Sequence, residues 1–552
     1  AAVAVVKFGL DVKPKLSTGM TGFDSTWYHG PFAAGFFQSG DTWSLHFIAP
    51  QFLAWFYPAN SELFHGIGML AFDRDVLSPL LNLGWFAGCL VACWCIGQPH
   101  GVAPWSLALG AIALSVPAFA DQAGEARNDI VGTFFLLAAV AIALNALAAA
   151  RDRSVRGSAR MPGESTNALI VVGLAAGLAA GAKLNFLLPA AVLVLGLALV
   201  APGARWRALL VTGVAALAGG GYWYLRNLVH SGNPLPWFDS LGPISLPAPD
   251  QPLGGREGHS VLGYLFDGGV WSDWFLPGLH DGLWALWPLL LALGLGGLLI
   301  SLGRGASPTL RVVAAAGLAT ALAWLLAPTS ASGPEGMPRG FESGLRYLTP
   351  ALILGLTVLP AALLPRVARW RGSPMAEGAR SASEHMGEGR RDRTRGPLIA
   401  GALVGLAAIA IGYPVQRHYL ENRYADPSFA APGLNAAFAW SREVSDSRIA
   451  TTSTRQYPLF GTDLSNHVQF VGIERPHGGF VPPTTCLQWR QLLDAGDFDY
   501  VVASFDRVEP DKPPFPRSVA WTEGAGAEVL VREPPTVVFR LTGRPSRARC
   551  RS

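Results

Sequence analysis

An acid, a histidine and several aromatic residues share one short segment near the start of the chain, Gly22-Phe23-Asp24-Ser25-Thr26-Trp27-Tyr28-His29-Gly30-Pro31. A carboxylate is costly in an apolar membrane environment and is usually retained there for chemistry. If the segment is helical, Asp24 and Tyr28 lie on one face, and Asp24 could take a proton from a hydroxyl group. Asp24 followed by Ser-Thr-Trp is also typical of a helix N-cap, so a structural role stays open. His29 by itself is more typical of a hydrogen-bonding partner than of a ligand.

Other acids stand near the ends of apolar runs. Glu62 could bind a substrate, although an acid on a helix surface is the simpler interpretation. A short segment between two apolar runs contains Asp121, Glu125, Arg127 and Asp129. Such groups need partners beside a membrane, and Arg127 could neutralise one of the acids. Asp129 begins an apolar run, where an acid complements the helix N-terminus; the functional alternative is a second carboxylate facing Asp24.

Three cations also stand at the ends of apolar runs, namely Lys183, Arg226 and Arg346. Phosphate groups need cations, and arginine binds them through two donors at once. The alternative is that these side chains reach lipid headgroups. No His-Glu-x-x-His or paired Cys-x-x-Cys motif indicates a metal site. Aspartate-rich loops permit a divalent ion without implying one, so no cofactor is assigned.

Composition indicates which elements must position these residues. The 552 residues are 50% hydrophobic and only 14% charged, whereas soluble domains contain about 25% charged residues. Apolar runs of about 20 residues recur, each long enough to cross a bilayer. The sequence therefore predicts a polytopic α-helical membrane protein of about eleven spans, if residues 1–10 are the remnant of a first span. The ten complete spans are expected near 77–97, 103–120, 129–150, 167–181, 185–201, 207–225, 282–302, 310–328, 346–365 and 397–414.

Charge then predicts sidedness. The net charge of +4 reflects arginines that cluster in a few loops, which indicates topology and not nucleic-acid binding, because basic loops face the cytoplasm. The run 167–201 has arginines beyond both ends and is too long for one span, so it must turn back near Lys183. Parity places the loops 11–76 and 226–281 outside. The Arg-rich loop 366–396 is expected to be cytoplasmic and disordered.

The tail differs from the rest of the chain, so we divide it into a membrane module, 1–414, and an external domain, 415–552. Strand-like and helix-like stretches alternate in the tail, which is typical of a small α/β domain. The expected elements are helices near 432–445 and 486–495 and strands near 448–452, 467–471, 500–504 and 537–541. Cys486 and Cys550 could form a disulfide if this domain is exported, but spacing does not fix the geometry.

The order of these sequence motifs along the chain resembles that in the GT-C class of integral-membrane glycosyltransferases. The resemblance is greatest to the branch of protein O-mannosyltransferases and the lipid A aminoarabinose transferase. The resemblance covers about residues 10–365. It rests on Phe23-Asp24, Tyr28-His29-x-Pro31, Tyr57-Pro58, Glu62-Leu63, Arg127-Asn128-Asp129, Gly181-Ala182-Lys183, Arg226-Asn227, Ser231-Gly232-Asn233-Pro234 and Arg346-Tyr347-x2-Pro350.

The resemblance implies a bacterial inner-membrane enzyme that moves a sugar from a polyprenyl-phosphate donor to an external hydroxyl, with inversion. Asp24 would be the general base and Asp129 the second acid. Lys183, Arg226 and Arg346 would hold the donor phosphate. The expected substrate-binding residues are Tyr28, His29, Glu62 and Glu125. The acid of the first loop stands alone where relatives often have paired acids, which puts metal use in doubt.

Other classes remain as alternatives. A lipid-linked substrate transporter or flippase would also place ions among spans, but usually near the midplane and with repeated halves, which are not visible here. An envelope polysaccharide ligase would act on a similar lipid-phosphate substrate. A membrane-anchored assembly protein would bind through its tail and would not need Asp24. The sugar and the acceptor, whether protein, lipid or glycan, are left open.

Overall fold

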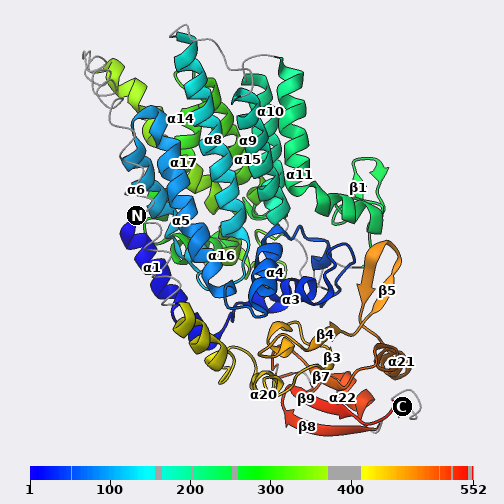
Figure 1. The fold of residues 1–552 in the computed structure, drawn as a ribbon. Coiled ribbons are helices and arrows are strands. Elements are labelled where there is room, and N and C mark those ends of the chain that lie inside the picture. The colour runs from blue at the N-terminus through cyan, green and yellow to red at the C-terminus, as the bar shows by residue number, and fades with distance from the viewer. Residues whose placement is uncertain are drawn as a thin grey trace.

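The structure is a computed structural model. It describes residues 1–50, 52–155, 164–200, 204–251, 259–327, 329–370, 412–508, 510–511, 513–523, 526–544 and 550. A bundle of long helices occupies one end of the molecule and a small sheet domain the other, with the N-terminal segment between them (Figure 1). The predicted cytoplasmic loop 366–396 and the predicted span 397–414 lie largely outside the described residues.

The long helices of the bundle are α5 (Ser78–Gly97), α6 (Ala103–Leu114), α8 (Asp129–Val155), α9 (Glu164–Ala182), α10 (Leu187–Val200), α11 (Arg205–Ser231), α14 (Trp287–Leu302), α15 (Pro308–Leu326) and α17 (Thr349–Trp370). Short elements between them are η3 (Gln98–His100), α7 (Pro117–Ala120), η4 (Leu184–Phe186), β1 (Ser240–Leu241), β2 (Ile244–Ser245), η5 (Val261–Tyr264), α12 (Gly268–Val270), η6 (Trp271–Phe275), α13 (Leu276–Leu283), α16 (Phe341–Gly344) and η7 (Leu345–Tyr347). Within the described residues, these helices follow the nine predicted spans from 77–97 to 346–365 closely.

Length and composition support membrane insertion. Four helices in the described parts of the chain could each cross a bilayer, namely Ser78–His100, Asp129–Ala149, Arg205–Ser231 and Pro308–Leu326. Two bent pairs raise this number to six if each pair is one span: Gly268–Leu283 with Trp287–Leu302, and Phe341–Tyr347 with Thr349–Leu364. Three shorter apolar helices accompany them. The chain is thus a polytopic membrane protein, and the count of eleven spans stays a prediction.

Small residues let the helices pack closely. A Cβ atom added at Gly177 would lie 2.0 Å from the carbonyl oxygen of Ala216, and one added at Gly220 would lie 2.1 Å from that of Gly177. Backbone contact of this kind is typical of membrane helices. It brings α9 against α11, so the end of α9 that precedes Lys183 has little freedom to move.

The N-terminal segment holds six short elements, which are α1 (Ala2–Val12), α2 (Lys15–Thr18), the π-helix η1 (Ser25–His29), α3 (Gly30–Ser39), η2 (Ala54–Phe56) and α4 (Asn60–Phe72). Asn60 ties the start of α4 to the bundle: its amide donates to the carbonyl of Gly219 at 2.9 Å and its oxygen accepts from Trp223 Nε1 at 2.8 Å. The segment predicted as a long loop is therefore largely helical and fixed to α11.

The C-terminal domain contains α20 (Pro432–Ser441), β3 (Arg448–Thr451), η8 (Tyr457–Phe460), β4 (His467–Phe470), β5 (Ile473–Arg475), η9 (Pro476–Gly478), β6 (Gly479–Val481), α21 (Cys486–Gly496), β7 (Tyr500–Ser504), α22 (Arg517–Thr522), β8 (Ala527–Glu533) and β9 (Thr536–Leu541). Five strands form one sheet in the order β4-β3-β7-β9-β8. The first three are parallel, and β9 and β8 are added antiparallel. The central strand β7 is buried, as expected for the apolar run Tyr500-Val501-Val502-Ala503.

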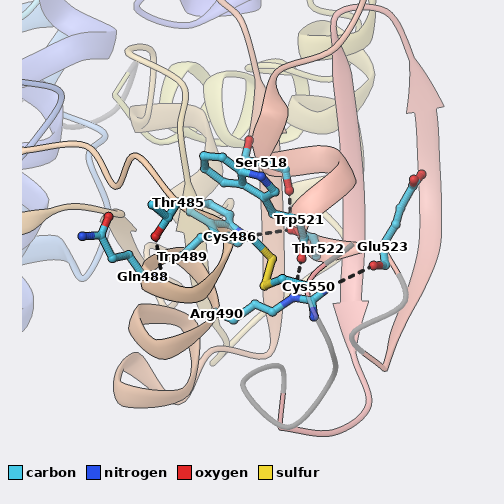
Figure 2. The surroundings of a disulfide bond; sticks show 10 residues. All are labelled: Thr485, Cys486, Gln488, Trp489, Arg490, Ser518, Trp521, Thr522, Glu523 and Cys550. Atoms are coloured by element: carbon cyan, nitrogen blue, oxygen red, sulfur yellow. Dashed lines mark hydrogen bonds between the residues drawn. A yellow bond between two sulfur atoms is a disulfide. The ribbon is translucent and has the colours of Figure 1, made fainter. Parts of the chain in front are cut away.

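A disulfide joins Cys486, at the start of α21, to Cys550 (Figure 2). The same helix is held to α22 by two hydrogen bonds, from Trp489 Nε1 to Thr522 Oγ1 at 2.9 Å and from Arg490 Nε to the carbonyl of Trp521 at 2.7 Å. The end of the chain is thus fastened to the face of the sheet domain that bears both helices. The pairing that the sequence left open is present in the structure.

Candidate active site

Asp24 lies in the helical turn that begins at Gly22 and leads into the π-helix η1. π-Helical turns are uncommon and are frequent at functional sites. The Asp24 side chain makes no capping hydrogen bond to η1. The N-cap role that the sequence left open is therefore not the role of this carboxylate, and its partner comes from another part of the chain.

That partner is Arg346, at the bend between η7 and α17. Its Nη1 atom lies 2.6 Å from Asp24 Oδ2, and its Nε atom lies 3.8 Å from Asp129 Oδ2. The two segments that form this corner meet at an angle of 48°. The bend turns the guanidinium toward both acids, so the one arginine links Asp24 and Asp129.

Lys183 completes the group from the break between α9 and α10. Its Nζ atom lies 2.6 Å from Asp129 Oδ1. The neighbouring Asn128 side chain donates to the carbonyl of Ala182 at 2.8 Å, which fixes the start of α8 against the end of α9. Asp129 is the first residue of α8, where the helix dipole also favours a negative charge. We call Asp24, Asp129, Lys183 and Arg346 the charge cluster.

Tyr347 is part of this arrangement, although sequence reasoning gave it no role. Its ring centre lies 4.7 Å from Lys183 Nζ and 5.1 Å from Arg346 Cζ, and its hydroxyl accepts from Arg346 Nη2 at 3.1 Å. An aromatic face beside two cations limits their rotation and holds them as a pair. The position of Tyr347 directly after Arg346 is the feature of the sequence that could have indicated this role.

The charge cluster is not sealed from solvent. The side chains of Asp24, Lys183 and Arg346 are 13%, 13% and 11% exposed, whereas Asp129 is 1% exposed. Asp129 therefore forms the floor of the site and the other three form its accessible rim.

The electrostatics keep Asp24 ionised. Burial raises the pKa of the Asp24 carboxyl, but the positive charges of Arg346 and Arg127 outweigh burial and hold the pKa well below its usual range. Burial, aided by the charge of Asp24, raises the pKa of Tyr28 well above its usual value. The site therefore presents a carboxylate next to a neutral phenol at any physiological pH.

His29 and Glu62 form a separate buried pair. His29 Nδ1 contacts Glu62 Oε1, and both side chains are at most 1% exposed. Burial raises the pKa of Glu62 to about 8 and lowers that of His29 well below its usual value. The pair is thus uncharged near neutral pH and joins η1 to α4. Neither residue has a hydrogen bond or ion pair with the charge cluster among the described residues.

Glu125 and Arg226 are likewise engaged elsewhere. Glu125 Oε1 accepts from Lys15 Nζ at 2.5 Å and from the Gly22 amide at 3.0 Å, so it fixes the turn before Asp24. The Arg226 guanidinium donates to the carbonyl of Trp55 at 2.6 Å, and the side chain is buried. Within the described chain it makes no hydrogen bond or ion pair with the charge cluster, and it holds the segment before α4.

The charges at this site are balanced by side chains. Within the described residues, no group of three or more histidines, cysteines or acids is arranged to hold a metal ion. Lys183 and Arg346 already face the two carboxylates that could otherwise share a divalent ion. Because both acids are already paired with cations, these residues do not fit a divalent ion.

Comparisons with known proteins bear on the fold. No protein-family model and no curated protein matches the sequence. The structure resembles ArnT from Cupriavidus metallidurans in its apo state, with a TM-score of 0.54, 17% identity and coverage of 98% of this chain and 97% of that one. ArnT bound to undecaprenyl phosphate gives a TM-score of 0.54 at 16% identity, with coverage of 98% and 96%.

The oligosaccharyltransferase of Archaeoglobus fulgidus, tethered with an acceptor peptide, is also similar. It gives a TM-score of 0.45 at 12% identity over 91% of this chain and 69% of its own, which is too distant to support an inference. The likeness to ArnT extends over both the helical bundle and the C-terminal domain. The resemblance to the GT-C class that the sequence indicated is therefore confirmed at the level of the fold.

Proposed function

We propose that this protein is a membrane glycosyltransferase that moves a sugar from a polyprenyl-phosphate donor to an acceptor hydroxyl outside the cytoplasm. The charge cluster is the observation on which the proposal rests. It combines two partly exposed cations, each 2.6 Å from an acid, with an Asp24 carboxylate that is ionised. The fold shared with ArnT, which has been solved with undecaprenyl phosphate bound, favours a lipid-linked donor.

In this proposal Lys183 and Arg346 bind the donor phosphate. The acceptor oxygen attacks the anomeric carbon from the side opposite the phosphate, so the configuration inverts. The bond between the anomeric carbon and the phosphate oxygen breaks, and the phosphate leaves with the electron pair. The two cations stabilise the charge that develops on it because they are already in place. Asp24 takes the proton of the acceptor hydroxyl.

Ion-pair exchange links donor binding to this step. Arg346 lies 2.6 Å from Asp24 and holds the pKa of that carboxyl well below its usual range, so Asp24 is a weak base in this ion pair. A bound phosphate competes for the same guanidinium. As Arg346 turns to the phosphate, the pKa of Asp24 rises toward its ordinary value, and the base gains strength only when the donor is present.

The arrangement favours a transferase over a transporter or flippase. Asp129 begins α8, Lys183 follows α9, and Arg346 precedes α17. The charges thus gather where helices end, whereas transporters place binding sites near the midplane of their spans. A polysaccharide ligase would use the same donor chemistry on a longer glycan, and only the acceptor separates it from the function proposed here.

The disulfide supports the proposed location. Disulfides persist in oxidising compartments such as the bacterial periplasm and are rare in the cytosol. Cys486 and Cys550 are joined, so we place residues 415–552, the charge cluster and the acceptor on the external side of the bacterial inner membrane. The domain boundary near 414 and the external loops 11–76 and 226–281 belong to the same proposal.

A transfer assay with the full-length protein in lipid nanodiscs tests the proposal. It uses a panel of radiolabelled undecaprenyl-phosphate sugars with a crude envelope fraction as acceptor, and compares wild type with Asp24→Asn. Asp11→Asn is the matched control, because Asp11 is an exposed acid that pairs with Lys7 at 2.7 Å on α1. We expect Asp24→Asn to lose transfer while it still binds undecaprenyl phosphate, and Asp11→Asn to resemble wild type. Equal transfer by Asp24→Asn would refute Asp24 as the base, and no transfer by wild type with any donor would refute the donor class.

A further inference from the structure

The segment that holds Asp24 is contacted by residues more than four hundred positions away. Residues 453–457, here called the clamp loop, connect β3 to the start of η8 in the C-terminal domain. They lie against η1 and the turn that precedes it. The contacts fall on both sides of Asp24, and each of them satisfies a backbone or packing need of the N-terminal segment.

The first contact lies after Asp24. The π-helical pattern pairs a carbonyl with the amide five residues later, as in the bond from the Gly30 amide to the Ser25 oxygen. The Thr26 oxygen would need the amide of residue 31, which is Pro31 and has no N–H. The amide of Gln456 donates to this oxygen at 2.8 Å instead. The π-helix is therefore completed by the C-terminal domain.

The second contact lies before Asp24. Arg455 Nη1 donates to the carbonyl of Thr21 at 3.1 Å, and its guanidinium lies 5.3 Å from the ring centre of Phe23. A guanidinium over an aromatic face adds to the hydrogen bond when both are partly shielded from water. Arg455 thus fixes the chain on the side of Asp24 that Gln456 does not reach.

The third contact fixes the end of η1. A Cβ atom added at Gly30 would lie 2.5 Å from Tyr457 Cδ2, so the tyrosine ring rests directly on this backbone. The Tyr457 hydroxyl donates to Asp75 Oδ2 at 2.7 Å, and Asp75 in turn pairs with Arg423. Tyr457 is thus held by a residue of the membrane module while it presses on α3.

The clamp loop is itself hydrogen-bonded to the sheet. Asp506, just after β7, accepts from Ser453 Oγ at 3.0 Å and from the Thr454 amide at 2.9 Å through one carboxylate oxygen. The position of the clamp loop is therefore set by the central strand of the sheet. A shift of the sheet domain would be transmitted to the backbone on either side of Asp24.

We infer that Arg455, Gln456 and Tyr457 are positioning residues for Asp24, and that the C-terminal domain completes the active site by ordering the π-helix. This inference rests on the proposed role of Asp24 as base. It gives the C-terminal domain a role in the chemical step that is separate from any role in binding the acceptor. The clamp contacts the backbone and rings around Asp24 and leaves the carboxylate free to face Arg346.

Arg455→Met is the sharpest test, because it keeps the length of the side chain and removes its donors. Arg448→Met is the matched control: Arg448 also donates to a backbone carbonyl, that of Gly496 at 2.8 Å, and lies 5.9 Å from the Phe498 ring centre, but within the C-terminal domain. We expect Arg455→Met to lower kcat about 10²-fold, the effect of a misplaced reacting group, with the Kd for undecaprenyl phosphate unchanged. Arg455→Lys should recover part of the rate, and Arg448→Met should retain all of it.

Hydrogen exchange of the peptide that covers residues 20–30 gives a readout that does not depend on catalysis. Arg455→Met should raise its exchange rate, as should Gly30→Ala, whose methyl group would meet the Tyr457 ring at 2.5 Å and the Ser25 carbonyl oxygen at 2.7 Å. Gly9→Ala is the control on α1, because a Cβ atom there meets nothing within 4 Å. Unchanged exchange and unchanged kcat in Arg455→Met would overturn the inference, as would an equal loss in Arg448→Met.

Asp24→Asn measured in parallel separates the two hypotheses. If Asp24→Asn is inactive and Arg455→Met turns over normally, only the positioning role is wrong. If Asp24→Asn turns over like wild type, the base assignment is wrong, and the role of the clamp loop in positioning that base is overturned with it. The exchange experiment then reports only whether the clamp loop orders the segment.

Discussion

Two clusters of charged and phenolic side chains join distant parts of this chain, and they differ in how completely they are closed. In the first, Asp75 forms an ion pair with Arg423 that is at most 2% exposed. Asp75 Oδ2 also accepts hydrogen bonds from the Tyr419 hydroxyl at 3.0 Å and the Tyr457 hydroxyl at 2.7 Å. In the second, the charge cluster, Asp24 and Arg346 remain 13% and 11% exposed. The closed cluster is shut off from solvent, although Asp75 Oδ1 has no hydrogen-bond partner among the described residues, and such burial is typical of a structural joint. The cations of the open cluster stay partly exposed to solvent.

Removal of the Asp24 charge should give the largest effect and should separate the clusters by activity. We expect Asp24→Asn to lower kcat by about 10² to 10⁴, the usual contribution of a general base. Its unfolding temperature should change little, because Arg346 retains Asp129 and Tyr347 as partners. Transfer rate and thermal unfolding of the same purified sample provide the check. A large loss of stability without a specific loss of rate would erase the distinction between the clusters.

The same substitution in the closed cluster should have the opposite signature. Asp75→Asn leaves the buried Arg423 without its counter-charge, and breaking such a pair costs about 3–5 kcal/mol. Thermal unfolding in detergent should therefore shift down strongly, while kcat per folded molecule falls much less than in Asp24→Asn. A stable Asp75→Asn protein would show that the closed cluster is not the joint that its burial indicates.

Donor binding should depend on the open cluster alone. Lys183→Met removes one of two phosphate partners, and a charge-assisted hydrogen bond contributes about 1.5–3 kcal/mol, so affinity for undecaprenyl phosphate should fall by roughly 10- to 100-fold. Lys7→Met is the control, since Lys7 is an exposed lysine that pairs with Asp11. Isothermal titration in nanodiscs measures both. Equal affinities would remove Lys183 from the phosphate site.

The smallest effect concerns the neutral pair beside the open cluster. The pKa of Glu62 is raised by burial to about 8, so the folded protein holds a proton that the unfolded chain releases near pH 4.3. The stability gained from this proton is fully present below about pH 4.3 and is lost as the pH rises through 8. Between pH 5 and 9 the unfolding temperature of wild type should thus fall relative to that of Glu62→Gln. Parallel profiles would mean that Glu62 is ionised in the fold.

The open cluster could be predicted from the sequence because its members are charged residues at unusual positions. Asp129, Lys183 and Arg346 interrupt or border apolar runs, where an ion needs a reason to be retained. Arg226 gave the same signal, yet the structure places it under the segment before α4. Nothing local distinguishes the two arginines, since the carbonyl that satisfies Arg226 belongs to Trp55, far away in the chain.

The closed cluster and the clamp loop were not predictable in this way. Their contacts join residues 20–75 to residues 419–457. Neither stretch has a sequence motif that indicates contact with the other. Strand β8 was also missed, because it is an edge strand with several exposed and charged residues and lacks the apolar run that identified β7. The strands and helices that were predicted are those whose burial leaves a period or an apolar run in the sequence.

The short hairpin of β5 and β6 has a consequence for protein engineering. It stands between the sheet domain and the bundle (Figure 1), where Phe480 stacks on Phe47 at 4.5 Å and the Trp55 indole donates to the carbonyl of Gly478 at 2.9 Å. A chimaera that exchanges only the C-terminal domain with a relative would leave these aromatic rings facing an unmatched surface. Such an exchange should therefore move the hairpin, the clamp loop and residues 17–57 as one unit.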